Sequence, residues 1–426
     1  MNGYKDIVRE VLDSGDIDVR NPNDDILLIS TDEEYTTAMN VCPGIMVDVR
    51  PNKNRLIVSC NFWDTSLMMK LTVDYLLELR KHSLPEPKEI YILDLFEASI
   101  GIGFWNQVFD QSFGRPKPGY VEQLMYRCRE LTDNTTVSLV NADINSDKSS
   151  IIRKAGRFDN YYSFPFGILY RTKAKLLDFK TENSTMDYQV SSKHFICMNA
   201  KINPNRINLV NYLHKEKIVD SCHLSWLAVD NRGNRIISVI NDEACFDYNK
   251  PIVLDVKSTE LRYNNSQETV DKFYYLTDSL IDIGIETLSD PEDEKKDIRF
   301  ITEKTWKPFL FGKIGFQFNY SEYYSDLKTF GFELYDEIFD YSFDKIKDNE
   351  IRFKEYCNEL KRISEISIKD LTSQILTIEE KILNNRNHAW NYKFPIPTVL
   401  KEYPNLGIGL NINNYIVNKE QRTTDE

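Results

Sequence analysis

Two short stretches of the sequence place a basic side chain at an expected helix start. In the first, Thr302 is a good N-cap residue, and Glu303 and Lys304 fill the first turn. A helix start presents free N–H groups and the positive end of the helix dipole, so it could hold a phosphate. In the second, Arg206 begins a helix directly after an expected strand, where its guanidinium could share that phosphate. By themselves these features also fit an ordinary cap and a surface charge.

The order of residues around these two stretches resembles a known family. The segment Phe300-Ile-Thr-Glu-Lys-Thr-Trp-Lys-Pro308 is similar to the Thr-Glu-Lys segment of the alpha-1,3-fucosyltransferase family. It is still closer to a group of bacteriophage-encoded glycosyltransferase-like proteins. In the fucosyltransferases a strand, an Arg at a helix start and a Val-Asp step precede Thr-Glu-Lys, as Arg206 and Val219-Asp220 do here. The resemblance covers residues 193–343.

The resemblance implies a role for each matched residue. Glu286 corresponds to the family's Glu that faces the donor sugar or its ribose, although Thr287-Leu288 follows it here in place of Asn-Ser. Glu286 and Glu303 would hold the donor, at the helix start that Thr302 caps. Arg206 and Lys304 would neutralise the diphosphate leaving group, which is the larger electrostatic need of the reaction.

Apolar periodicity predicts an α/β fold in two domains. Strands and helices alternate in the first half, which favours a mostly parallel sheet. The expected architecture is a GT-B-like glycosyltransferase with C-terminal helices. We expect an acceptor-side α/β domain over residues 1–180, a nucleotide-sugar domain over 185–345, and helices that brace both domains, followed by a polar tail, over 346–426. For the opening stretch, the sequence predicts a helix that ends at Gly312 and a buried strand over Ile314–Phe318.

Carboxylates at two strand ends of the first half are candidate catalytic bases. Asp94 and Glu97 follow the expected strand Glu89–Asp94, and Asp143 follows the expected strand Thr136–Val140. Ligands of parallel sheets bind at the carboxyl ends of the strands, so one of these residues could take the proton of an acceptor hydroxyl. A solvated charge is the alternative for each.

The composition limits the possible partners. With 426 residues, a net charge of −13 and a pI near 5.1, a broad basic surface for nucleic-acid backbone is disfavoured. The seven cysteines include no C-x-x-C pair, which favours a reducing cytoplasm, in the host if the protein is viral. No apolar run is long enough for a membrane span. The D-x-D at Asp16–Asp18 precedes the first strand, so we expect no essential metal and no cofactor besides the nucleotide-sugar substrate.

The sequence therefore predicts a glycosyltransferase that moves a sugar from a nucleotide-diphosphate sugar to a hydroxyl. The acceptor could be a glycan, a protein or a modified DNA base in viral DNA. A second possibility is a non-catalytic accessory protein that keeps the fold and binds a glycan or a protein partner. Donor sugar, nucleotide, stereochemical course and oligomeric state stay open.

Overall fold

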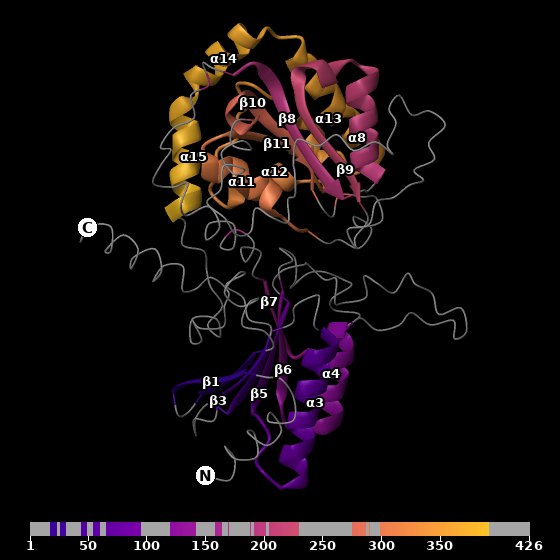
Figure 1. Cartoon of the computed structure of the whole chain (residues 1–426), viewed down its shortest axis with the longest axis vertical. Helices are drawn as coiled ribbons and strands as arrows, with labels where there is room; N and C mark the ends of the chain where they lie inside the picture. The colour runs from indigo at the N-terminus through magenta and orange to yellow at the C-terminus, as the bar shows by residue number, and fades with distance from the viewer. Residues whose placement is uncertain are drawn as a thin grey trace, which may run out of the picture. The chain divides into compact units, whose positions relative to one another are not determined.

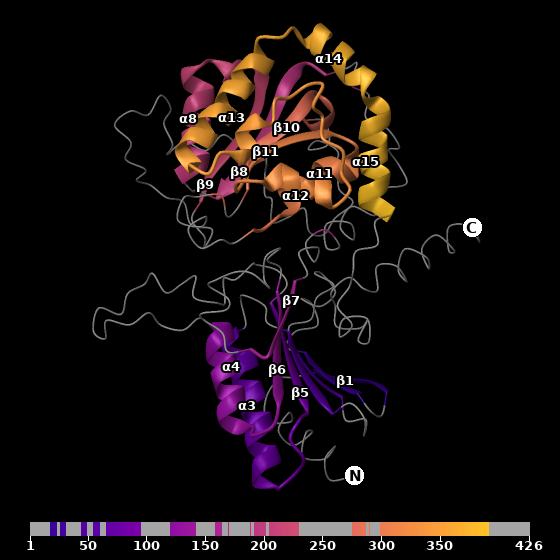
Figure 2. The same cartoon turned by 180° about the vertical axis from the view of Figure 1, so that it is seen from behind.

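The structure is a computed structural model. It describes residues 18–23, 26–30, 44–48, 54–59, 65–94, 120–141, 158–163, 169, 188, 191–201, 204–229, 275–286, 289 and 299–391. The chain divides into two compact units (Figures 1 and 2). Unit 1 contains the described strands and helices up to residue 163, and unit 2 contains those from residue 193 onward.

Unit 1 is a seven-stranded sheet whose strands follow one another in sequence order. Antiparallel neighbours form its first part, and the pairs from β4 onward are parallel. The strands are β1 (Asp18–Asn23), β2 (Ile26–Ser30), β3 (Gly44–Asp48), β4 (Arg55–Ser59), β5 (Glu89–Asp94), β6 (Thr136–Asn141) and β7 (Asn160–Ser163). The expectation of a mostly parallel sheet is therefore wrong for the first part of unit 1. The chain between Asp48 and Arg55 is too short for a crossover helix, so β3 and β4 must be antiparallel.

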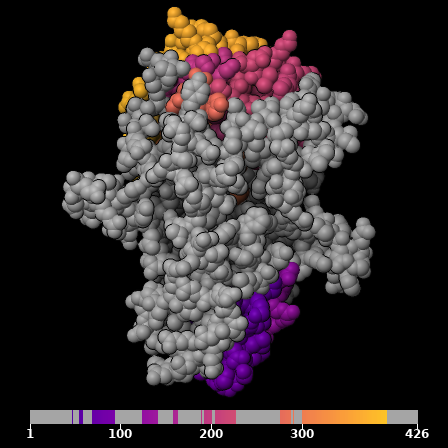
Figure 3. Space-filling view, in the orientation of Figure 1, coloured from indigo at the N-terminus to yellow at the C-terminus, as the bar shows by residue number. Residues whose placement is uncertain are grey.

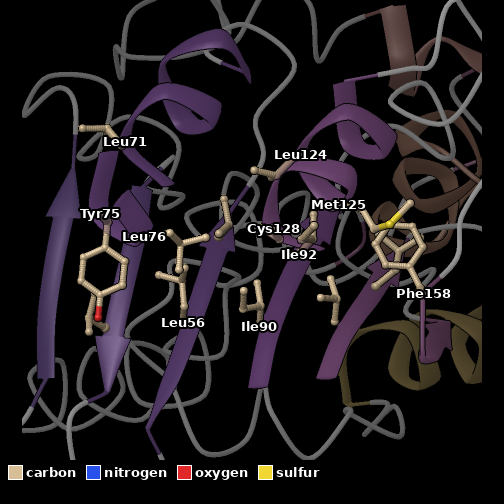
Figure 4. Close-up of a cluster of buried hydrophobic side chains, with 14 of the residues drawn as sticks. Leu56, Leu71, Tyr75, Leu76, Ile90, Ile92, Leu124, Met125, Cys128 and Phe158 are labelled. Atoms are coloured by element: carbon tan, nitrogen blue, oxygen red, sulfur yellow. The ribbon is translucent and has the colours of Figure 1, made fainter. Parts of the chain in front are cut away.

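Two helices cover one face of this sheet, α3 (Thr65–Lys81) and α4 (Tyr120–Leu131). Figure 4 shows their apolar side chains directed toward those of the strands below. From the helices come Leu71, Tyr75, Leu76, Leu124, Met125 and Cys128; from the strands come Leu56, Ile90 and Ile92. The apolar side chains of the helices and those of the short strands thus form the two sides of one core.

Unit 2 is built on a four-stranded sheet in which all neighbouring strands are parallel. Its strands are β8 (Lys193–Lys201), β9 (Cys222–Val229), β10 (Ser279–Ile285) and β11 (Ile314–Phe318), in the order β11-β10-β8-β9. Helix α8 (Pro204–Lys215) and the short 3-10 helix η3 (Ile218–Ser221) connect β8 to β9. Helix α11 (Glu303–Phe311) precedes β11.

Helices lie on both faces of this sheet (Figures 1 and 2). On one face, Tyr356 of α13 (Asn349–Ser364) stacks on Phe316 of β11, with 5.0 Å between ring centroids. On the other face, a Cβ at Gly315 would lie 3.0 Å from Pro308 of α11. Gly315 and Phe316 are consecutive strand residues and point to opposite faces, so α13 and α11 cover opposite faces. Helix α8 packs against α13 and so shares its face.

The C-terminal helices complete unit 2. They are α12 (Tyr323–Thr329), the 3-10 helix η4 (Ser342–Lys345), α13, α14 (Ile368–Thr377) and α15 (Glu379–Asn391). Figure 3 shows surface atoms of the C-terminal part of unit 2 in yellow on the face in view. Helix α15 packs on α11, where the indole N–H of Trp390 donates to the carbonyl of Leu310 at 2.9 Å. The α/β class, the parallel-strand sheets and the C-terminal helices are confirmed.

No helix among these described residues is long and apolar enough to cross a membrane.

Candidate functional site

The strand order of unit 2 creates one place where the chain changes direction across the sheet. From β8 the chain passes to β9 on one side, whereas β10 and β11 lie on the other side of β8. The switch point therefore lies between the carboxyl ends of β8 and β10, and ligands of open parallel sheets bind at such points. Among the described strands of unit 1 the order is sequential, so that sheet has no switch point.

The helix α11 begins beside this switch point with the cap that the sequence predicts. Thr302 has an extended backbone, and its hydroxyl accepts a hydrogen bond from the Lys304 N–H. Gly312 ends the helix in the left-handed region at φ 67°, which costs glycine little, and β11 follows over the expected residues. Pro308 lies inside the helix, which continues to Phe311. The proline ring lies against Gly315 of β11.

Several backbone N–H groups at this helix start, those of Thr302, Lys304, Thr305 and Trp306, are engaged within the protein. Thr302 N–H donates to the Glu286 carboxylate at 3.1 Å, and the N–H groups of Thr305 and Trp306 donate to the Thr302 carbonyl. The expectation that this start presents free N–H groups to a ligand is therefore wrong for these positions. The anion at the positive end of α11 is the carboxylate of Glu286, which lies there because Glu286 directly follows the last residue of β10.

Glu286 is fully buried, and a set of hydroxyl groups surrounds it. The Thr302 hydroxyl donates to one carboxylate oxygen, and the Thr305 hydroxyl donates to the other at 2.6 Å. The Thr305 hydroxyl is also 2.6 Å from the Tyr323 hydroxyl of α12. The carboxylate thus binds the start of α11, and the donor role that the resemblance implies for it stays a prediction.

Charged side chains of α11 lie on the more accessible part of this helix start. The ammonium of Lys304 is 3.1 Å from Glu303 and 3.3 Å from the Thr302 hydroxyl, and its side chain is 23% exposed. Burial alone would raise the pKa of Glu303, but the charges of Lys304 and Lys307 outweigh it and hold that pKa well below its ordinary value. The Glu303 side chain is 42% exposed, so solvent weakens this pairing. The Lys304 ammonium therefore lies beside both the Glu303 carboxylate and the hydroxyl that caps the helix.

Arg206 reaches the same switch point from α8. Its side chain is buried, and the guanidinium donates from Nη2 to the carbonyl of Ile285, the last residue of β10, at 3.2 Å. Its neighbour Asn205 donates to the carbonyl of Ser289, as does Asn349 from the start of α13. The chain after β10 is thus held from both α8 and α13, and the predicted donor residues Arg206 and Glu286 meet at the end of one strand.

A pair of opposite charges under α11 was not predicted from the sequence, the partly exposed Asp282 and the buried Lys313. Asp282 of β10 accepts a hydrogen bond from the Gln317 amide at 3.1 Å, and the fully buried Lys313 donates to the carbonyl and the hydroxyl of Ser279. Burial raises the pKa of Asp282 and lowers that of Lys313, and each charge moderates the shift of the other. The strand periodicity puts both on the face that α11 covers, a pattern that could have indicated their proximity.

The candidate bases of unit 1 are only partly described. Asp94 ends β5, where its backbone pairs with Asn141 of β6. Its side chain, Glu97 and Asp143 lie outside the described residues, as does the D-x-D at Asp16–Asp18. In the part of the chain that is described, no three His, Cys, Asp or Glu side chains gather as metal ligands would. The proposed base and the metal independence stay predictions.

No protein-family model matches this chain, and no curated protein or solved structure matches it either.

Proposed function

We propose that unit 2 binds the diphosphate of a nucleotide sugar, and that the protein is a two-domain, GT-B-like glycosyltransferase that transfers the sugar to a hydroxyl. One observation carries the proposal: Arg206 and Lys304 approach the same switch point from α8 and α11, helices on opposite faces of a parallel sheet. A dianionic leaving group needs such cationic partners, and the switch point is where open sheets bind nucleotides.

The chemistry assigns a task to each group. During transfer the bond between the anomeric carbon and the diphosphate oxygen breaks, and a bond to the acceptor oxygen forms. Lys304 stabilises the negative charge that builds up on the diphosphate, while Arg206 fixes the end of β10 and adds positive potential. The acceptor proton passes to a base, for which Asp94, Glu97 and Asp143 are the candidates in unit 1.

The test is nucleotide binding by matched lysine variants. UDP, GDP, ADP, CDP and their sugars are screened for a rise in melting temperature, and affinities are then measured by calorimetry. Lys304→Ala is expected to melt close to the wild type but to bind one to two decades more weakly, the loss of about 1.5 to 3 kcal/mol for a hydrogen bond to a charged group.

The control is Lys361→Ala. Lys361 is 46% exposed and pairs with Glu216, just beyond the C-terminal end of α8 and so at the far end of that helix from Arg206. The Lys361→Ala variant removes an equal charge from the same unit and is expected to leave nucleotide binding unchanged. A wild-type melting curve that none of these nucleotides moves would refute the donor site.

The buried position of Glu286 favours one second candidate. If the carboxylate that the resemblance assigns to the donor is committed to α11, the fold could bind a glycan or a protein partner without turnover. Release of free nucleotide from a nucleotide sugar supports the enzyme. Binding of the sugars with no release across the panel supports the accessory protein.

A further inference from the structure

The helix start of α11 contains more than an N-cap requires. Two other helices of unit 2 show the simple form: Ser367 caps α14 by accepting from the Asp370 N–H, and Asp348 caps α13 by accepting from the Ile351 N–H. Both are local bonds within one turn. At α11, Thr302 makes the local bond to Lys304 as well, so its cap is complete without Glu286.

The additional part is a buried chain of hydrogen bonds that begins on another element. It runs from Glu286 at the end of β10, through the Thr305 hydroxyl in the first turn of α11, to the Tyr323 hydroxyl at the start of α12. All three residues are at most 2% exposed: Glu286 0%, Thr305 2% and Tyr323 2%. Taking a carboxylate out of water is costly, and a cap alone does not require it.

What this chain of bonds does is fix the helix to one strand end. The Glu286 carboxylate accepts three hydrogen bonds, from the Thr302 N–H, the Thr302 hydroxyl and the Thr305 hydroxyl. Together these bonds restrict both the rotation of α11 about its own axis and the position of its first turn relative to the end of β10. Lys304 lies between these two threonines in sequence, so its direction is set by the same bonds. Its ammonium also contacts the Thr302 hydroxyl, which is itself held by Glu286.

We propose that Glu286 and Thr305 are positioning residues, which lock the first turn of α11 onto the end of β10 and thereby aim Lys304 at the switch point. The proposal rests on the proposed function only in taking a phosphate as the group that Lys304 meets. Binding residues held by a pre-formed network lose less freedom when the ligand arrives, which is the physical gain from such a device.

The test compares Thr305→Val with Thr305→Ser in the full-length protein. Valine removes the hydroxyl at nearly constant shape, whereas serine keeps it and serves as the conservative rescue. Hydrogen exchange is followed in a peptide covering residues 300–312 and in a control peptide from α13, residues 353–364. Valine is expected to accelerate exchange about ten- to a hundredfold in the first peptide alone, the range for one hydrogen bond to a charged group, whereas serine is not expected to accelerate it.

A second readout reports on Lys304 itself. Amine labelling by an N-hydroxysuccinimide ester, quantified by mass spectrometry, compares Lys304 with Lys361. Because Lys304 is held by Thr302 and Glu303, loosening the first turn should raise its labelling rate several-fold in Thr305→Val while that of Lys361 stays constant. Tyr323→Phe, which removes the outer hydroxyl of the chain, is expected to give a smaller change in the same direction and replaces Thr305→Val should valine prevent folding.

The outcomes separate this proposal from the proposed function. Local acceleration with faster Lys304 labelling supports positioning, whether or not a nucleotide binds. Unchanged exchange and labelling, or equal acceleration in both peptides, overturns it, because Thr305 would then be dispensable or would support unit 2 as a whole. A wild type that binds none of the nucleoside diphosphates refutes the proposed function and leaves the positioning result standing.

Discussion

Thr302→Ala measures how strongly the hydroxyl at the start of α11 is engaged. That hydroxyl accepts from the Lys304 N–H, as any N-cap does, and donates to the buried Glu286 carboxylate. Loss of a cap costs about 1 kcal/mol, and loss of a hydrogen bond to a charged group costs about 1.5 to 3 kcal/mol more. We therefore expect a decrease of about 3 kcal/mol in the free energy of unfolding.

The matched control is Ser367→Ala at the start of α14. Its hydroxyl also caps a helix, but its other bond is to Asp370 at the surface. Only the cap should be lost there, about 1 kcal/mol. Thr302→Ser keeps the hydroxyl and removes the methyl group, so the difference between Ala and Ser at position 302 isolates the hydroxyl.

Urea unfolding followed by tryptophan fluorescence suits the measurement, since Trp226 and Trp306 are fully buried in unit 2. At roughly 2 to 4 °C per kcal/mol, the melting temperature should fall by about 6 to 12 °C in Thr302→Ala. Equal losses in Thr302→Ala and Ser367→Ala would refute the reasoning, because Glu286 would then contribute nothing through this hydroxyl.

Two further predictions concern the support around α11. Asp344 accepts from the N–H groups of Tyr324 and Ser325, and burial raises its pKa from 3.8 to about 6. Its stabilising contribution is therefore complete below pH 3.8 and is lost as the pH rises through 6. When the free energy of unfolding is measured at pH 4 and at pH 8, Asp344→Asn should become more stable relative to the wild type by up to about 3 kcal/mol over that interval. In Gly284→Ala the new Cβ would lie 2.6 Å from the Gln317 side-chain oxygen, so the Gln317 amide must move; the expected cost is about 1 to 3 kcal/mol, and a double-mutant cycle with Gln317→Ala should remove most of it.

Elements whose ends carry their own local signals are well predicted by the sequence. The cap at Thr302, the left-handed Gly312 and the strand Ile314–Phe318 all lie where local chemistry puts them. Strand β5 likewise lies at its expected residues, Glu89–Asp94. These features depend on neighbours within a few residues, which a single sequence displays.

What depends on partners distant in sequence could not be predicted. The strand β1 is polar, and β7 lies in an aromatic stretch without strand alternation, so pairing with neighbouring strands decides both. The engagement of Glu286 by Thr302 and Thr305 requires the end of β10 to meet the start of α11. Sequence spacing shows that these residues are near in the chain, but it does not show whether the carboxylate faces the helix or a ligand.

The bond from Trp390 to Leu310 has a consequence for how the protein is made. The carbonyls of Pro308 and Phe309 accept from the N–H groups of Lys313 and Gly312, but that of Leu310 is bonded to a residue 80 positions later. On the ribosome, the helix that carries Lys304 can form early, yet it gains this last partner only after α15 has emerged. Until then a carbonyl at its C-terminal end must be satisfied by water, so a nascent chain should complete the C-terminal end of α11 only once α15 has folded onto it.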